Sequence, residues 1–255
     1  MKKNHLHNKT ALVTGATKRI GKAIANVLAE NKVNVIIHHS PSSKETAEEV
    51  VTQIRTEGVK SWSFQADFSN LNEIDTLVKN IHEAVGAVDF LINNASIFPV
   101  SNLKTLDIQD LQHTLMVNSI APFRLSQQIA KQNREGCIIN FLDNRIRNYD
   151  LNHAAYQLSK NLLFHMTEMM AIDFAPRLRV NGIAPGLILP PVGMDESFLV
   201  KNSKRNLLFR YGTLPNITDA VLFLLSNTFI TGEVLCIDGG QNLKEKSYER
   251  STFTP

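Results

Sequence analysis

The chain has 255 residues, of which 43% are hydrophobic and 20% charged, which is enough to bury one sizeable hydrophobic core. Its 27 basic and 24 acidic residues are scattered along the sequence and give a net charge of +3, which argues against a nucleic-acid partner and against a membrane surface. No run approaches the roughly 18 continuous apolar residues of a membrane span, and no apolar segment follows the basic N-terminus, so we expect a cytoplasmic protein.

Short β-branched segments alternate with longer segments of helical period. The alternation predicts strands at 10–14, 33–37, 61–65, 88–93, 137–141, 178–184 and 234–238. Apolar stripes between them predict helices, including one through 111–132 and one from about Ala154 to Phe174. This pattern is typical of repeated βαβ units. We therefore predict a single α/β domain of the doubly wound Rossmann type, with a seven-stranded parallel sheet and helices on both faces.

The domain is expected to occupy the whole chain, 1–255, with its core at about 10–243. Five prolines and glycines between Pro185 and Gly193 interrupt the alternation and predict a loop at about 187–212 that covers a substrate. The residues from Gln241 onward are polar, so we expect a loosely ordered tail that includes 244–255.

Residues 14–21, TGATKRIG, form a glycine-bounded turn directly after the first predicted strand and open a helix. Backbone N–H groups and the helix dipole of such a turn can hold a pyrophosphate. Alone the turn is weak support, because Gly15 and Gly21 would also suit any tight connection between strand and helix. The turn predicts a dinucleotide site that other motifs have to support.

The end of the second strand bears on the choice between NADPH and NADH. NAD-specific Rossmann sites carry an acidic residue there, whereas this chain has His38, His39 and Ser40. The charges and donors available nearby to a 2′-phosphate are those of Lys18, Arg19, Ser40, Ser42, Ser43 and Lys44. We therefore predict NADPH as the cofactor. The alternative is that the two basic residues are a solvated surface pair and that the serines cap a helix.

Tyr156 and Lys160 stand four residues apart on a predicted helix, so their side chains share one face. An unperturbed tyrosine has a pKa of about 10, and a nearby ammonium together with the nicotinamide charge would lower it. We expect Tyr156 to be a general acid and Lys160 its electrostatic partner. Because this spacing also occurs by chance in many helices, the assignment depends on its context.

That context resembles the short-chain dehydrogenase/reductase family over residues 10 to about 243. The resemblance is carried by TGATKRIG, by Asp67 in QADFS, by NNAS at 93–96, by Asn118, by YQLSK from Tyr156, by PG at 185–186 and by DGG at 238–240. It implies that Asp67 holds the adenine, that Asn118 supports Lys160 through water, and that Lys160 also binds the nicotinamide ribose. It implies a homotetramer as well, which the apolar circumference of the 154–174 helix also favours.

By this resemblance, the cofactor-binding residues are Gly15, Thr17, Lys18, Arg19, Ile20, Gly21, His38, His39, Ser40, Ser42, Asp67, Phe68, Asn94, Ala95, Ser96, Tyr156, Lys160, Pro185, Gly186 and Ile188, with Asn93 also lining the cofactor. The expected catalytic residues are Asp143, Tyr156, Lys160 and Asn118, and the expected substrate contacts are Arg19, Ser96, Phe98, Asp143 and Tyr156. No metal ion is expected.

Two departures from the family pattern narrow the expected substrate. The usual middle glycine of the loop is Arg19, and the usual catalytic serine position holds Asp143. Together with Phe98 they resemble the pteridine reductase subgroup, which includes bacterial dihydromonapterin reductases that also reduce dihydrofolate. A carboxylate can accept from a pterin amino group or assist the tyrosine, and Phe98 would stack on the flat pterin. Pro41 replaces a basic residue common in some pteridine reductases, which weakens the NADPH prediction.

We therefore predict NADPH-dependent reduction of a C=N bond in a dihydromonapterin-like or dihydrobiopterin-like pterin, or in dihydrofolate, with Tyr156 as proton donor. The alternatives are a carbonyl or 3-oxoacyl-carrier-protein reductase and a nucleotide-binding protein without turnover. Asp143, Phe98 and Arg19 also have ordinary structural explanations, as a turn cap, core filling and a solvent-facing side chain.

Overall fold

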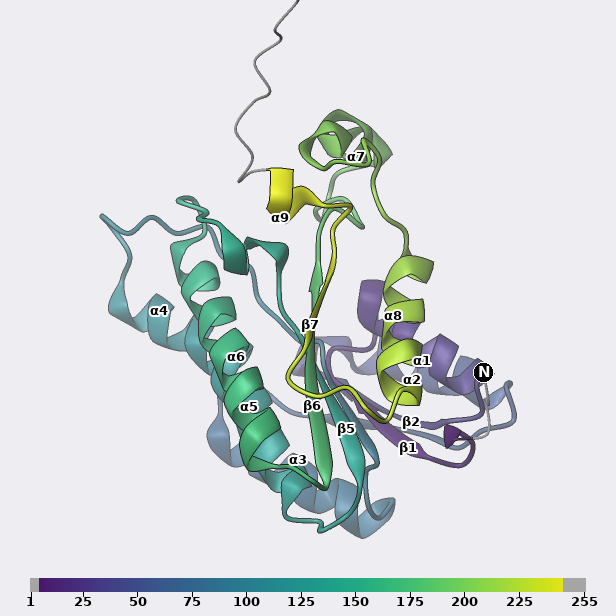
Figure 1. Ribbon diagram of the computed structural model, residues 1–255. Coiled ribbons are helices and arrows are strands. Elements are labelled where there is room, and N and C mark those ends of the chain that lie inside the picture. Colours follow the sequence, from purple (N-terminus) through teal and green to yellow (C-terminus); the bar gives the residue numbers. More distant parts are fainter. Residues whose placement is uncertain (1–4, 245–255) are drawn as a thin grey trace, which may run out of the picture.

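A parallel sheet forms the centre of the molecule in the computed structural model, which describes residues 5–244 (Figure 1). Its strand order is β3-β2-β1-β4-β5-β6-β7, and all six neighbouring pairs are parallel. The strands are β1 (Thr10–Val13), β2 (Asn34–His39), β3 (Ser61–Gln65), β4 (Phe90–Asn93), β5 (Gly136–Phe141), β6 (Leu178–Pro185) and β7 (Val234–Ile237). The predicted Rossmann-type fold is confirmed, and the predicted strand ends lie within two residues of the observed ones.

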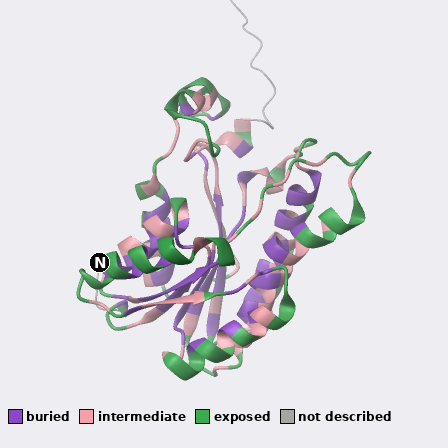
Figure 2. Cartoon of the chain, turned by 180° about the vertical axis from the view of Figure 1, so that it is seen from behind, coloured by how far each residue is buried: buried purple, intermediate pink, exposed green. Residues whose placement is uncertain are grey.

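Helices cover both faces of the sheet (Figure 1). One face carries α1 (Arg19–Glu30), α2 (Lys44–Arg55) and α8 (Leu214–Ser226), and the other carries α3 (Leu71–Ala84), α5 (Ala121–Ala130) and α6 (Ala154–Asp173). Leu12 packs in the core under α3, α5 and α6, and its neighbour Val13 packs in the core under α1, α2 and α8. Because successive strand residues are buried on opposite faces, the strands read as continuous apolar runs. The buried residues are concentrated between sheet and helices (Figure 2).

The helix predicted through 111–132 is divided in the structure. It consists of α4 (Ile108–Leu115), a π-helical turn η3 (Met116–Ile120) and α5. A π turn inserts an extra residue into the helical ladder and is frequent at functional sites. Asn118 lies within this turn, and its side chain is fully buried.

The region after β6 holds more regular structure than predicted. The loop predicted at 187–212 contains α7 (Glu196–Asn202) and η5 (Ser203–Arg205), and α8 follows it as a helix that we did not predict. A capping box between Thr213 and Asn216 marks the start of α8. Pro215 suits a loop as well as a helix start, because proline is well tolerated in the first turn of a helix.

The first residues of the predicted polar tail have regular structure. Gln241–Lys244 form α9, where the carboxylate of Asp238 accepts from the backbone N–H and from the side-chain amide of Asn242, both at 2.8 Å. These bonds bury Asn242 and order the segment. The rest of the predicted tail, 245–255, lies outside the described residues.

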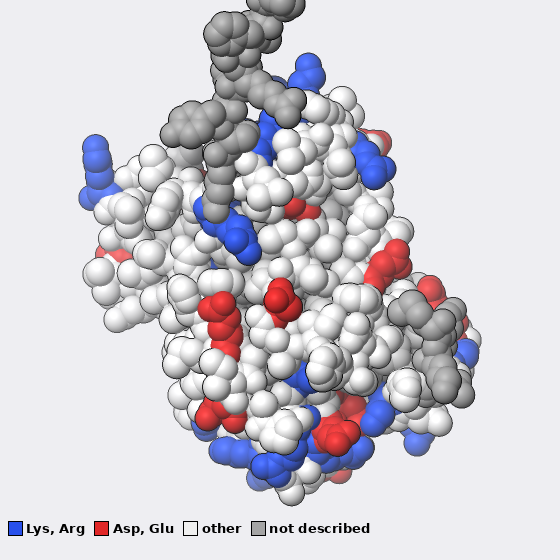
Figure 3. All heavy atoms as spheres, in the orientation of Figure 1, with Lys and Arg blue, Asp and Glu red and all other residues white. Residues whose placement is uncertain are grey.

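The surface carries charges of both signs. On the face shown in Figure 3, Lys and Arg side chains are interspersed with Asp and Glu. Within residues 5–244, no helix is both long enough and apolar enough to cross a membrane. On α6, however, Leu158, Met169 and Ile172 are apolar and exposed.

The strand order determines where a ligand can bind. The chain proceeds outward from β1 through β2 to β3, then returns to add β4 on the other side of β1 and continues to β7. The carboxyl ends of β1 and β4 therefore diverge into connections on opposite faces, and such a point forms a crevice where α/β proteins bind ligands. The turn at 14–21 follows β1 there, and the NNAS motif at 93–96 spans the end of β4.

Candidate active site

Two adjoining cavities open at the carboxyl edge of the sheet, with volumes of about 520 and 210 Å³. Residues predicted to bind a cofactor line the larger one: Gly15, Thr17, Lys18, Gly21, His38, His39, Ser40, Ser42, Asp67, Phe68 and Ala95. The smaller one is lined by Asp143, Tyr156, Lys160, Pro185, Gly186 and Ile188. Four predicted residues line both cavities: Arg19, Ile20, Asn94 and Ser96.

Sequence reasoning missed several of the lining residues. They are Ala66, Ile97, His113 and Val117 in the larger cavity, and Phe141, Leu142 and Leu189 in the smaller one. Ala66 and Ile97 directly adjoin the motifs at Asp67 and 93–96, so position along the chain would have found them. His113 has no such signal, because it comes from α4 and reaches the cavity only through tertiary packing.

The first loop requires both of its glycines, Gly15 for its backbone conformation and Gly21 for lack of space. Gly15 has a φ of +62°, which favours glycine. A Cβ on Gly21 would lie 2.3 Å from the carbonyl oxygen of Gly15 and 2.6 Å from Nδ2 of Asn94. The start of α1 therefore packs directly on the loop backbone, with no side chain at position 21 between them.

The loop after β4 clamps the loop after β1. The hydroxyl of Thr14 accepts from the backbone N–H groups of Asn94 and Ala95, both at 2.9 Å. The side-chain amide of Asn94 donates to the carbonyl of Thr14 at 2.8 Å. These bonds place both loops on one wall of the larger cavity.

Arg19 joins the two cavities. Its backbone has a φ of +53°, a left-handed conformation that non-glycine residues rarely adopt. Its guanidinium donates to the carbonyl of Pro190 at 2.8 Å, which ties the first loop to the loop predicted to cover the substrate. The solvent-facing alternative for Arg19 is therefore incomplete, because the side chain is exposed and also bonded.

Where the end of β2 meets the larger cavity, the chain carries no acidic residue. Lys18 is exposed on the cavity wall, and Ser40, Ser42 and Ser43 follow His39 there. Across from them, Asp67 accepts from the backbone N–H and the hydroxyl of Ser69, both at 2.8 Å. These bonds lower the pKa of Asp67, so it is a carboxylate at neutral pH.

The phenol of Tyr156 is buried and donates to Oδ2 of Asp143 at 2.9 Å. The expected lowering of its pKa is wrong for this structure. Burial, and then the charge and hydrogen bond of Asp143, raise the pKa of Tyr156 well above its usual value. The ammonium of Lys160 lies 5.7 Å from the centre of the Tyr156 ring and does not offset them. Tyr156 is therefore a neutral phenol, the form that can donate a proton.

Lys160 is also buried, and its ammonium donates to the carbonyl of Phe141 at 2.7 Å. Burial lowers the pKa of Lys160 to about 8, against the opposing effect of the Asp143 charge.

The side chain of Asn118 bonds a backbone carbonyl and a serine hydroxyl. Its amide donates to the carbonyl of Ile97 at 2.9 Å and to the hydroxyl of Ser159 at 3.0 Å. It thus fixes the loop after β4 against α6.

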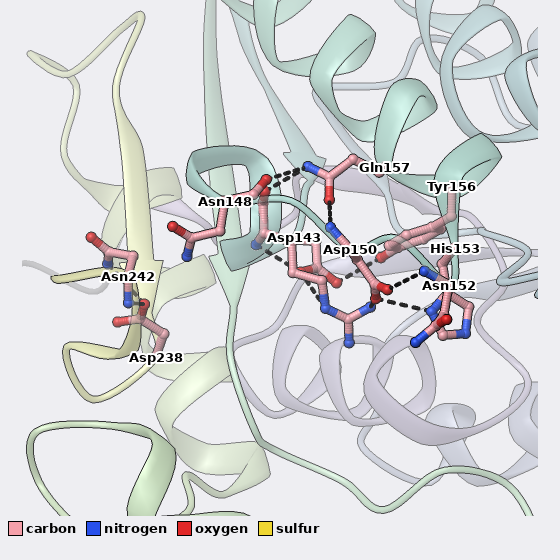
Figure 4. Close-up of polar contacts among 10 residues, drawn as sticks. Asp143, Asn148, Asp150, Asn152, His153, Tyr156, Gln157, Asp238 and Asn242 are labelled. Atoms are coloured by element: carbon pink, nitrogen blue, oxygen red, sulfur yellow. Dashed lines mark hydrogen bonds and ion pairs between the residues drawn. The ribbon is translucent and has the colours of Figure 1, made fainter. Parts of the chain in front are cut away.

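Asp143 belongs to a network of charged side chains shown in Figure 4. It caps the short helix η4 (Asn144–Arg147), because its Oδ1 accepts from the backbone N–H of Arg145 at 2.9 Å. The Arg145 guanidinium lies 3.6 Å from the same oxygen and donates to Asp150 at 3.0 Å. Asp150 also bonds His153 at 2.9 Å. The turn-cap explanation of Asp143 holds, and its second oxygen still faces Tyr156.

Phe98 is 49% exposed, which contradicts the core-filling explanation, and it lies outside the lining of both cavities. Its ring stacks on His153 with centroids 4.0 Å apart and meets the edge of Tyr156 at 4.5 Å.

The expectation that Asn93 lines the cofactor is also corrected. Asn93 is buried and donates to Asn140 of the neighbouring strand at 2.8 Å, so it supports the sheet and does not line the cavity.

Across residues 5–244, no group of three or more His, Cys, Asp or Glu side chains is placed to hold a metal ion. A neutral phenol, an ammonium and a carboxylate meet beside a cavity whose glycine-rich wall suits a dinucleotide.

Known proteins resemble this chain in sequence and in architecture. A family model described as short chain dehydrogenase matches residues 9–198. The 3-oxoacyl-[acyl-carrier-protein] reductase FabG of Staphylococcus epidermidis is 32% identical, with 91% of this chain and 98% of the relative covered. The FolM alternative dihydrofolate reductase 1 of Brucella canis, solved with NADP, is 32% identical with a TM-score of 0.86, covering 97% and 98% of the two chains. Its counterpart from Brucella suis, also with NADP, is 31% identical with a TM-score of 0.88, covering 96% and 98%. The chain therefore belongs to the short-chain dehydrogenase family.

Proposed function

We propose that the protein is an NADPH-dependent reductase of the C=N bond of a dihydropterin or of dihydrofolate. The observation that carries the proposal is the contact between Asp143 and Tyr156 at 2.9 Å. A carboxylate at this position can accept from the amino group of a pterin, whereas a ketone offers it no donor. The similarity to the two Brucella proteins named as dihydrofolate reductases supports the same substrate class.

The larger cavity fits NADPH. Gly15 and Gly21 line it and let the loop after β1, the start of α1 and the loop after β4 pack closely together, and both Brucella structures hold NADP. The adenine would lie near Asp67, and the 2′-phosphate near Lys18 and Ser42. When bound, NADPH supplies the hydride.

The residues around the smaller cavity would complete the reduction. Tyr156 gives its proton to the substrate nitrogen while the adjacent carbon receives the hydride, so that C–H and N–H bonds replace the π bond. Asp143 orients the pterin through its amino group, and Lys160 stabilises the negative charge left on the phenol. A pterin stacked on Phe98 would share the ring with His153, whose centroid lies 4.0 Å away, and with the Arg145 guanidinium, 4.9 Å from the ring centre.

The proposal is tested by following NADPH oxidation with dihydromonapterin, dihydrobiopterin and dihydrofolate. We expect turnover of at least one of them, with NADH giving a lower kcat/KM than NADPH. If none is turned over, the pterin proposal fails.

A second function is favoured by one specific observation, the 32% identity to a 3-oxoacyl-[acyl-carrier-protein] reductase. Such an enzyme reduces a ketone, and the same assay with an acetoacetyl thioester tests it. Turnover of the thioester without turnover of any pterin would establish this alternative in place of the first.

The exposed apolar side chains of α6, Leu158, Met169 and Ile172, are the surface on which we place the proposed homotetramer. They lie on the helix that carries Tyr156, so assembly there would also stiffen the catalytic helix.

We expect Lys18→Ala to weaken NADPH binding about fivefold and to leave NADH binding unchanged. An exposed ion pair with the 2′-phosphate contributes on the order of 1 kcal/mol, and NADH lacks that phosphate. Fluorescence titration with both cofactors measures the two constants. Lys79→Ala, which removes an exposed lysine from α3, is the matched control. An equal loss for NADPH and NADH would contradict a phosphate contact.

We expect kcat to fall as the pH rises through about 8. Burial lowers the pKa of Lys160 to about 8, so the ammonium is lost there, while Tyr156 stays protonated because its pKa is raised. The measurement is the pH profile of kcat at saturating NADPH and substrate, between pH 6 and 10. A profile that stays level to pH 10 would show that the charge of Lys160 is not needed.

A further inference from the structure

His38 lies in β2 beneath the larger cavity and is only 3% exposed. Both nitrogens of its ring face protein backbone. The N–H of Gly15 donates to Nδ1 at 3.2 Å, and Nε2 lies 3.1 Å from the carbonyl oxygen of Ala66. Gly15 lies in the loop that follows β1, and Ala66 begins the loop that follows β3, so one side chain bridges two separate loops.

These partners fix the state of the ring. A backbone N–H can only donate and a carbonyl can only accept, so Nδ1 must carry a lone pair and Nε2 a proton. The ring is therefore one neutral tautomer. Burial, with a further contribution from His39, lowers the pKa of His38 to about 4, which keeps it neutral throughout the physiological range.

Two further contacts join the same loops. The His38 ring stacks on Phe68, with centroids 3.9 Å apart and planes within 4°. The carbonyl of His38 accepts from the N–H of Ala16 at 3.2 Å. Gly15 belongs to the wall expected to hold the pyrophosphate and Ala16 follows it in the same loop, while Ala66 and Phe68 flank Asp67, the residue expected at the adenine.

We infer that His38 is a positioning residue that holds the pyrophosphate loop and the adenine loop at the spacing NADPH requires. The inference rests on the proposed function, because it takes NADPH as the ligand of the larger cavity. It also changes the role expected from the sequence, where His38 was a direct cofactor contact. Since both ring nitrogens are already bonded to the protein, His38 acts on the cofactor through Gly15 and Ala66.

The test separates this role from mere packing. His38→Phe keeps a ring to stack on Phe68 but removes both nitrogens, and His38→Asn restores an acceptor near the Nδ1 position. We expect the Kd for NADPH to rise about tenfold in His38→Phe, with kcat at saturating NADPH within threefold of the unmodified enzyme, and we expect partial recovery of the Kd in His38→Asn. Ile54→Ala is the matched control, because Ile54 is a buried residue in the last turn of α2 that lines neither cavity, and its truncation destabilises the core.

The control should lower the Tm and leave the Kd unchanged. An unchanged Kd in His38→Phe, or an equal rise in Ile54→Ala, would overturn the inference while the proposed function stands. If the unmodified protein does not bind NADPH, the proposed function fails instead. The ring state is tested without any ligand or variant by 15N NMR of the imidazoles. We expect an unprotonated Nδ1 and a protonated Nε2 at pH 6, and a doubly protonated His38 ring at that pH would overturn the inference.

Discussion

Replacing Tyr156 by phenylalanine is expected to lower kcat about 10³-fold and to leave the Kd for NADPH within twofold. The phenol is the proton donor in the proposed reaction, and general acid catalysis typically contributes 10²–10⁴-fold. The ring itself remains, so its edge contact with Phe98 and the packing of α6 persist. Steady-state kinetics with the best pterin substrate, together with a fluorescence titration of NADPH, provides both numbers.

The matched control is Tyr149→Phe, which removes a hydroxyl from an 89% exposed tyrosine seven residues earlier in the chain and should leave kcat unchanged. A kcat in Tyr156→Phe that keeps more than a tenth of its original value would mean that the proton reaches the nitrogen from another group. Asp143 or water would then be the donor.

Exchanging Asp143 for serine should reverse the substrate preference. We expect kcat/KM for the dihydropterin to fall about 10- to 100-fold, because a charge-assisted hydrogen bond of 1.5–3 kcal/mol to the amino group is lost. Reduction of a ketone should be kept or increased, since a serine hydroxyl can donate to a carbonyl oxygen. The ratio of the two kcat/KM values, measured for both proteins, is the readout.

Serine can still cap η4, so the fold should tolerate the change. Asp107→Ser, at the start of α4, removes another capping aspartate and serves as the control. Asp143 also raises the pKa of Lys160, so the alkaline decline of kcat should move below pH 8 in Asp143→Ser. Unchanged pterin reduction would refute the role of Asp143, and loss of ketone reduction would refute the carbonyl alternative.

Much of the fold was predictable because a parallel sheet buries both faces of its strands, so that segments such as 88–93 stand out as apolar runs. The two helices that were not predicted, α8 and α9, depend on individual contacts at or near their ends. α8 was missed because Pro215 resembles a loop residue until the capping box at Thr213 is recognised. α9 depends on one buried carboxylate, Asp238, whose partners cannot be inferred from a polar tail.

The residues of the site could be predicted where sequence motifs mark them. The direction of the pKa shift of Tyr156 could not. Sequence spacing places Lys160 beside Tyr156, so a lowered tyrosine pKa was expected. Asp143 lies 13 residues from Tyr156 in sequence, and only the fold brings its charge to the phenol. The bonding of His38 is similar, because neither Gly15 nor Ala66 is near it along the chain.

The left-handed backbone of Arg19 shows that the positions of the first loop differ in what they permit. At Gly21 any side chain would collide with the loop, so no amount of selection can place one there. At residue 19 the obstacle is conformational only, and an L-residue costs roughly 1–2 kcal/mol relative to glycine. Glycine would avoid that cost but could not make the bond from the guanidinium to the carbonyl of Pro190. Arg19 therefore exchanges backbone strain for a link between the first loop and the segment after β6.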